Sequence, residues 1–170
     1  YFNIFRGLAN SLFVSVCVTA LTAYFSALTA YGFAIYDFKF KNIIFTIILV
    51  LMMVPAQLGL LGFYDLVNTL NLMDSYIPLI IPSIASPFVV FFLRQYLQSV
   101  MPMSIIEAAR IDGASEFKIF HKIGIPMMAP GIATIAITTF IGAWNNYLMP
   151  LVLLFTPDKF TLPVMMASLK

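Results

Sequence analysis

Residues 7–36 read GLANSLFVSVCVTALTAYFSALTAYGFAIY, a run of 30 residues without one charged side chain or histidine. An α-helix needs about 20 apolar residues to cross roughly 30 Å of hydrocarbon. The run is therefore long enough for one membrane span. It is also too long, and too closely followed by further apolar segments, to be a cleaved signal peptide.

Three more uncharged windows follow along the chain. They hold 23, 19 and 35 residues and lie between Lys41 and Asp65, Asp74 and Arg94, and Lys122 and Asp158. Each window has the length of one span rather than two. We therefore expect an all-α, polytopic membrane helix bundle with four transmembrane helices, near residues 9–34, 43–63, 77–97 and 127–149.

The composition agrees with a membrane protein. Of the 170 residues, 62% are hydrophobic and 9% are charged, whereas a soluble domain is about 45–50% apolar and about 25% charged. This excludes an ordinary soluble enzyme and a disordered chain, and a net charge of +2 is too small to indicate nucleic acid. One cysteine, Cys17, and one histidine, His121, exclude a disulfide framework and a metal centre built on several such residues. We expect no cofactor and no metal site.

The distribution of basic residues predicts the orientation in the membrane. The stretch after the first span, the end of the third span and the stretch after it contain Lys39, Lys41, Arg94, Arg110, Lys118 and Lys122, whereas the loop 64–76 contains no Lys or Arg. Because positive charge accumulates on the cytoplasmic side, residues 36–42 and 98–125 are expected inside and 64–76 outside. Both ends of the chain are then also expected outside. This orientation places six basic residues inside and three outside.

Residues 98–126, QSVMPMSIIEAARIDGASEFKIFHKIGIP, predict two short helices with a break between them. Ser104 and Glu107 have the spacing of a capping box, which starts a helix. Asp112-Gly113 is expected to end this first helix, since glycine tolerates the left-handed conformation. The second helix is expected from about Ala114, and Pro126 marks the next boundary.

One face of this segment is too apolar for water, because it carries Ile105, Ile106, Ile111, Phe117, Ile119 and Phe120. Two interpretations stay open from the residues alone. The segment lies on the lipid interface or under its own helices, or it docks as a helix in the groove of a cytoplasmic protein.

The segment resembles a known signature. Glu107-Ala108-Ala109, three residues, Gly113, nine residues, and Ile123 to Pro126 resemble the EAA motif of binding-protein-dependent ABC importer permeases, with Ile125 where the pattern usually has Leu. Within that family, the chain is similar to the carbohydrate-uptake branch, related to the maltose and multiple-sugar permeases. This similarity is carried by the strings Ala108–Ser115, Arg94-Gln95-Tyr96 and Trp144-Asn145-Asn146-Tyr147-Leu148.

The resemblance implies a multi-pass permease subunit in the bacterial cytoplasmic membrane that imports a sugar or oligosaccharide. It implies one transmembrane domain of six spans, of which residues 1–170 are a fragment holding the second to fifth. Residues 98–126 would form the coupling segment, with Glu107–Gly113 as a helix seated in a cleft of an ATPase subunit. The residues expected to serve ATPase coupling are Glu107, Ala108, Ala109, Asp112, Gly113 and Phe117.

The resemblance also implies the partners. These are an ABC ATPase dimer, a second permease subunit that makes a heterodimer, an extracytoplasmic solute-binding protein, the sugar and the lipid bilayer. The chain itself is expected not to be an enzyme. In agreement, the sequence contains no G-x-x-x-x-G-K-[ST] phosphate loop, so ATP hydrolysis is expected on another subunit.

Other functions are less favoured. The expected spans contain no Asp, Glu, Lys, Arg or His apart from Arg94 near one end, which counts against a carrier coupled to protons or ions. The sequence shows no nucleophile–base pair, which counts against a membrane enzyme. A permease for another solute, and a passive channel or scaffold subunit, stay open as alternatives.

Three residues are candidates for the substrate path. Gln57 follows Pro55 in the second expected span, and broken helices near the midplane recur in substrate pathways. The alternative is a packing kink with Gln57 hydrogen-bonded to a neighbouring helix. Asn145 and Asn146 are expected near the outer end of the last span. One of them hydrogen-bonds a sugar hydroxyl or meets the external binding protein, or, alternatively, both belong to an aromatic belt with a capped helix end.

Overall fold

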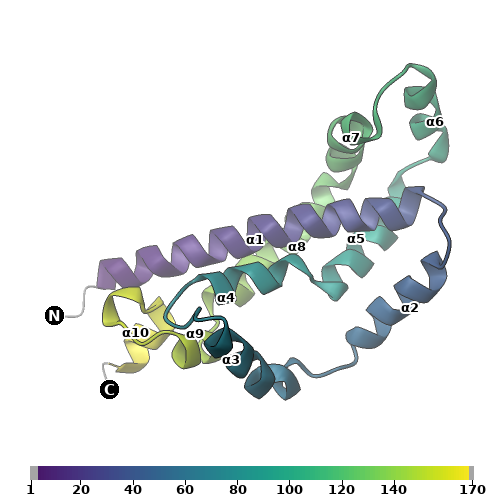
Figure 1. Cartoon of the computed structure of the whole chain (residues 1–170). Helices are drawn as coiled ribbons and strands as arrows, with labels where there is room; N and C mark the ends of the chain where they lie inside the picture. The colour runs from purple at the N-terminus through teal and green to yellow at the C-terminus, as the bar shows by residue number, and fades with distance from the viewer. Residues whose placement is uncertain (1–3, 169–170) are drawn as a thin grey trace. The chain divides into compact units, whose positions relative to one another are not determined.

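The computed structural model describes residues 4–168, and within them the chain is helical and contains no strand. Figure 1 shows the helices in chain order. The α-helices are α1 (Ile4–Ile35), α2 (Lys41–Leu51), α3 (Leu60–Thr69), α4 (Ile77–Ile80), α5 (Pro87–Val100), α6 (Met103–Ile111), α7 (Glu116–Ile119), α8 (Ile125–Trp144), α9 (Leu148–Leu153) and α10 (Leu162–Ser168). Shorter helical turns are η1 (Ala56–Gly59), η2 (Ile81–Ile84), the π-helix η3 (Phe120–Gly124) and η4 (Pro157–Lys159). The all-α expectation is confirmed.

Helix α1 has small residues along one buried face. Ser11, Ser15, Thr22 and Ser26 are at most 2% exposed, and Ala30 is fully buried. Their spacing of four or seven residues places them on one side of the helix. Small side chains let neighbouring backbones approach closely, as membrane helices require.

The described chain divides into two compact units. The first unit comprises residues 4–21, 55–84 and 137–168, and the second comprises residues 22–54 and 85–136. Helices α1 and α8 each contribute residues to both units.

The second unit is built around a hydrophobic core from α1, α5, α6, η3 and α8. Tyr31, Leu93, Leu97, Phe120 and Met128 are each at most 2% exposed within it. Helices α5 and α8 approach closely at Gly131, where an added Cβ would lie 2.9 Å from Cδ1 of Tyr96. A larger residue at position 131 would therefore require the ring to move.

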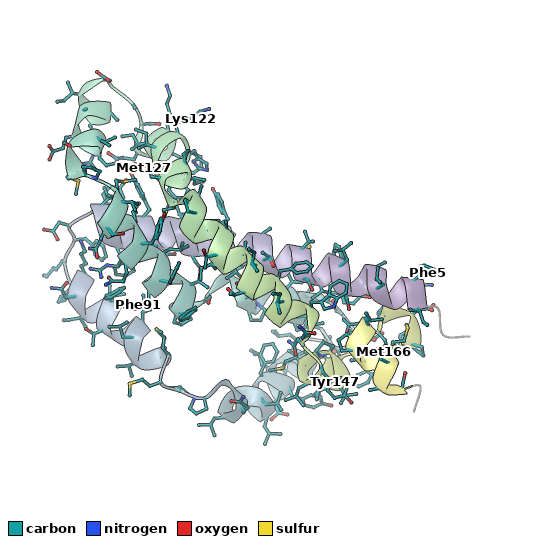
Figure 2. The ribbon with its side chains drawn as sticks, turned by 180° about the vertical axis from the view of Figure 1, so that it is seen from behind. Phe5, Phe91, Lys122, Met127, Tyr147 and Met166 are labelled. Atoms are coloured by element: carbon teal, nitrogen blue, oxygen red, sulfur yellow. The ribbon has the colours of Figure 1, made fainter. Side chains whose placement is uncertain are left out.

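Helix α2 packs against α5 in the second unit. The ring of Phe91, labelled in Figure 2, stacks on Phe45 at a centroid distance of 6.3 Å. The guanidinium of Arg94 lies 4.0 Å from the centre of the Phe45 ring, and its Nε donates to the Phe33 carbonyl oxygen at 3.4 Å. Arg94 thereby connects α5 with both α1 and α2.

The first unit joins the start of α1 to the loop before α10. The Asn10 amide donates to the carbonyl oxygens of Asp158 and Phe160 at 2.9 and 3.0 Å. The hydroxyl of Ser11 accepts a hydrogen bond from the Leu162 N–H at 2.8 Å. These bonds satisfy backbone groups of an irregular loop that would otherwise be unpaired.

The second expected span, 43–63, is not one helix. Helix α2 ends at Leu51, and a new helical turn starts at Ala56. Pro55 has no N–H and adopts an extended conformation, with φ −63° and ψ 125°, and proline also disfavours a helical residue before it. Pro55 therefore breaks the helix rather than only kinking it.

The last expected span, 127–149, extends too far. Helix α8 ends at Trp144, and Leu148 starts a separate helix, α9. The third expected span, 77–97, is divided into α4, η2 and α5, because residues 85–86 lie outside any helix. Among residues 4–168, the helical segments long and apolar enough to span a membrane are Ile4–Ile35, Ile77–Val100 and Glu116–Trp144, with Lys41–Leu51 as a shorter apolar helix. The structure confirms a polytopic arrangement of apolar helices, whereas the number of four spans stays a prediction.

Candidate functional site

The expected break in segment 98–126 is present at Gly113. This residue has φ +76°, and the N–H groups of Gly113 and Ala114 donate to the carbonyl oxygens of Arg110 and Ala109, both at 3.0 Å. This pair of bonds is the Schellman arrangement, which ends a helix at a left-handed glycine. The predicted role of Gly113 in the turn is confirmed.

The predicted capping box at Ser104 is wrong. Helix α6 begins at Met103 after Pro102, so Ser104 lies inside the first turn, and the helix has no side-chain cap. The following helix has one, because the Ser115 hydroxyl accepts from the N–H of Lys118 at 3.4 Å. A serine before Glu116 could have indicated this cap from the sequence.

The apolar face of the segment divides into a buried and an exposed part. Ile106, Ile119 and Phe120 are at most 1% exposed and pack in the core of the second unit. Ile111 and Phe117 are 86% and 64% exposed. Part of the face is thus covered by the chain's own helices, and part is free.

The residues expected to serve coupling lie mostly at the surface. Glu107, Ala108, Asp112, Gly113 and Phe117 are exposed. Ala109 is half-buried against the core. Helices α6 and α7 lie next to each other at one end of the second unit (Figure 1).

A charged group that the motif analysis missed connects α6, α7 and the end of α1. The carboxylate of Glu116 accepts from Nε of Arg110 at 2.7 Å and from the hydroxyl of Tyr36 at 2.5 Å. Burial and the hydrogen bond to Glu116 raise the pKa of Tyr36 to about 12. Tyr36 therefore stays a protonated donor at any physiological pH.

The connection between α7 and α8 is a π-helix, η3, over Phe120–Gly124. Nδ1 of His121 lies 2.8 Å from the Phe117 carbonyl oxygen, and its Nε2 lies 3.2 Å from the Tyr24 hydroxyl. In the neutral ring the carbonyl takes the proton on Nδ1, which leaves Nε2 as the acceptor for the Tyr24 hydroxyl. Figure 2 shows Lys122 projecting from this stretch and Met127 on the helix that follows.

Two of the three path candidates line one cavity. Gln57 of η1 and Asn146, ahead of α9, line a space of about 280 Å³ together with Leu60, Leu148 and Met149. An adjoining cavity of about 300 Å³ also includes Asn146 and Met149, with Gly59, Phe63, Pro78, Leu79 and Pro82. Both linings are uncharged, and the volumes lie near the lower end of the roughly 300–1,000 Å³ of small-molecule sites.

The third candidate, Asn145, lies differently. Its Nδ2 donates to the carbonyl oxygen of Ile141 at 2.9 Å, and its N–H donates to the same oxygen at 3.1 Å. It does not belong to the lining of these two cavities. The observed bonds fit the alternative of a capped helix end. Tyr147, labelled in Figure 2, follows this turn.

Asp74 is a further polar centre that the motif analysis missed. Its Oδ1 accepts from the N–H groups of Phe155 and Thr156, and its Oδ2 accepts from the Thr156 hydroxyl at 2.7 Å and Nζ of Lys159 at 2.9 Å. The bonds from Thr156, with those from Lys159 and Phe155, hold the pKa of Asp74 well below its ordinary value. No local spacing indicates this group, because its partners lie more than 80 residues away.

Among residues 4–168 no group of three or more His, Cys, Asp or Glu side chains is arranged to hold a metal ion.

A family model described as "Binding-protein-dependent transport system inner membrane component" matches residues 11–169. The chain belongs to this family. It is accordingly an inner-membrane component of a transport system, and its apolar helices agree with this location.

Named relatives are similar over most of the chain. The arabinooligosaccharides transport system permease protein AraQ of Bacillus subtilis is 42% identical over 165 residues, which cover 97% of this chain and 58% of the relative. AraQ of Halalkalibacterium halodurans is 41% identical over 160 residues, covering 94% and 57%. These relatives are transport permeases rather than enzymes.

A solved structure shares the fold. It is the crystal structure of a bacterial ABC transporter involved in the import of the acidic polysaccharide alginate, with a TM-score of 0.89 and 28% identity. The match covers 97% of this chain and 58% of that one. The chain thus spans a little under three fifths of the length of the proteins it matches.

Proposed function

We propose that this chain forms most of the transmembrane permease subunit of an ATP-driven ABC importer, which carries a sugar or oligosaccharide across the cytoplasmic membrane. The observation that carries the proposal is the 42% identity over 165 residues to an arabinooligosaccharide permease. In this proposal residues 1–170 belong to one transmembrane domain of six spans and contribute the second to fifth.

ATP hydrolysis takes place on a separate ATPase dimer, which binds the coupling segment, residues 98–126. The exposed Ile111 and Phe117 supply apolar surface next to the left-handed turn at Gly113. Glu107, Ala108 and Asp112 are accessible beside them. Small and apolar side chains with a few charges at the edge suit a helix inserted in a protein groove.

The orientation follows from the charges of the loops. The coupling segment faces the cytoplasm, and the loop with Asp74 faces outside, where a solute-binding protein delivers the cargo. A second and different permease subunit completes the path. The exposed apolar surfaces of α1 and α2 face this subunit or lipid.

The substrate path includes the cavity between Gln57 and Asn146. Each amide offers both a donor and an acceptor, which is the pairing that a sugar hydroxyl needs. The lining carries no charge, so it suits a neutral cargo. Asn145 supports the turn that presents Asn146, because it bonds to the end of α8.

The test is purification of the complete protein containing this chain from its native membranes. We expect an ATPase subunit and a second permease subunit to co-purify in fixed ratio. Proteoliposomes with this complex and its binding protein should accumulate arabinooligosaccharides only when ATP is supplied on the ATPase side. A complex with its ATPase inactivated by substitution of the phosphate-loop lysine serves as the control.

Three results would contradict the proposal in different ways. Purification without any ATPase favours a scaffold, and equilibration of the sugar without ATP favours a passive channel. ATP-driven uptake of another solute in place of every sugar tried would retain the importer and remove the cargo class.

A further inference from the structure

Three tyrosines of α1 and its end contact the second half of the coupling segment. Tyr24 and Tyr31 are seven residues apart and lie on the same face of α1, and Tyr36 follows the last residue of the helix. We call Tyr24, Tyr31 and Tyr36 the tyrosine row. All three residues and their partners belong to the second unit.

Each member of the row contacts a different part of residues 116–124. Tyr36 donates to Glu116 at 2.5 Å. The ring of Tyr31 lies edge-on to Phe120, with centroids 5.3 Å apart. The hydroxyl of Tyr24 lies 3.2 Å from Nε2 of His121. The contacts therefore include the first residue of α7, Glu116, and the first two residues of the π-helix, Phe120 and His121.

The centre of this contact is a packed core. Tyr31 is 2% exposed, Phe120 is 1% exposed, and an added Cβ on Gly124 would lie 3.1 Å from two atoms of the Tyr31 ring. Interiors packed at this density transmit displacement, because the side chains have no free volume to absorb it. The tyrosine row therefore combines exposed polar contacts at Tyr24 and Tyr36 with a buried packing contact at Tyr31.

The polar end of the row reaches the helix expected to dock on the ATPase. Arg110, in the last turn of α6, donates to the same Glu116 carboxylate as Tyr36 and lies 5.8 Å from the centre of the Tyr36 ring. Glu116 is therefore shared between α6, the first turn of α7 and the end of α1. A single carboxylate joins three segments that are separate along the chain.

The backbone connects the coupling segment directly to α5 and α8, since α6 follows α5 and α7 continues through η3 into α8. Helix α1 does not adjoin the segment along the chain, and the contacts described above reach it through side chains. We propose that the tyrosine row, with Glu116 as its positioning residue, makes α1 move together with the coupling segment when the ATPase displaces that segment. This inference rests on the proposed function.

The test compares transport with ATP consumption in the complete importer. Tyr36→Phe removes one hydroxyl and keeps the ring, and Glu116→Gln removes the charge and keeps the size. Both variants should assemble and hydrolyse ATP as the wild type does, while the sugar imported per ATP falls severalfold. Tyr64→Phe on α3 is the matched control, because it removes a hydroxyl outside the row and should keep the wild-type ratio.

The outcomes separate the possible explanations. Wild-type ratios in both Tyr36→Phe and Glu116→Gln would overturn the inference and leave the importer intact. Loss of the ATPase subunit from either variant would also overturn it, because the residue would then act in docking. Absence of ATP-driven uptake in the wild type would refute the proposed function and this inference with it. If Glu116→Gln does not accumulate, Tyr36→Phe decides alone.

Discussion

Lys159 binds Asp74 twice, with its Nζ 2.7 Å from the backbone oxygen and 2.9 Å from Oδ2 of the carboxylate. Asp74 also has φ +56°, a left-handed conformation that Asn adopts readily and Ala does not. The pair fastens the loop between α3 and α4 to the loop after α9. The first loop joins α3 and α4 and the second follows α9, and all three helices contribute residues to the cavity linings.

We expect Asp74→Ala to destabilise the protein by about 1–3 kcal/mol, because it removes acceptors of charge-assisted and backbone hydrogen bonds. Asp74→Asn keeps an acceptor and the backbone conformation, so its loss should be smaller. Thermal unfolding of the purified protein in detergent measures both. Equal unfolding temperatures for Asp74→Ala and the wild type would contradict the assigned role.

The stability supplied by Asp74 should depend on pH. Its pKa is lowered in the folded state, so its contribution is complete above the ordinary carboxyl pKa of about 3.9 and is lost as pH falls towards the folded value. Between about pH 6 and pH 3, the wild type should therefore lose more stability than Asp74→Asn. Parallel slopes of unfolding temperature against pH would disagree with this expectation.

Replacement of Gly113 should act through the backbone alone. An added Cβ meets no atom within 4 Å there, but φ is +76°. Gly113→Leu should cost about 1–2 kcal/mol in a left-handed conformation and abolish transport, with insertion into the membrane unchanged. Gly113→Asn should retain most transport, because Asn tolerates this conformation. Uptake assays with quantified membrane levels distinguish the two variants.

Two glycines of α8 allow a comparison between a closely packed position and an open one. Gly131→Ala would place its Cβ 2.9 Å from the Tyr96 ring, whereas Gly142→Ala meets no atom within 4 Å. We expect the first to destabilise by about 1–3 kcal/mol through overpacking. The second should be neutral or stabilising by up to about 1 kcal/mol through helix propensity. Unfolding temperatures in the opposite order would contradict the close approach of α5 and α8.

Neighbouring asparagines test the substrate path. Asn146 lines both cavities, whereas the Asn145 amide bonds to the carbonyl oxygen of Ile141. Asn146→Ala should raise the apparent KM for the sugar by roughly two- to tenfold, the range of one lost hydrogen bond. Asn145→Ala should lower stability with little change in KM. An unchanged KM in Asn146→Ala would remove this residue from the path.

Sequence reasoning predicted the helical membrane class and the turn at Gly113 because both depend on local rules. Charged side chains are excluded from hydrocarbon over the length of a span, and few residues other than glycine end a helix in a left-handed conformation. The break at Pro55 was harder to predict, since the same proline permits a kinked helix. Only the conformation of the surrounding residues decides between these outcomes.

The polar centres were largely beyond prediction. Asp74 meets Thr156 and Lys159, and Glu116 meets Tyr36, across separations of about 80 residues. No motif records such a pairing, because it arises from the packing of distant helices. Gln57 was predicted from a proline that interrupts a span and Asn146 from its place near the outer end of a span, but their shared cavity is visible only in the structure.

The π-helix at Phe120–Gly124 has a consequence for how the chain length can vary. Its wider turn holds one residue more than an α-helical turn, and each residue rotates a helix by about 100°. Deleting one residue there would restore ordinary α-helical pitch and leave the later side chains of α8 on nearly their present faces, because the wider turn absorbs the extra residue. Related chains should therefore tolerate the loss of one residue in this stretch more readily than a deletion within the α-helical part of α8, which would rotate all later side chains by about 100°.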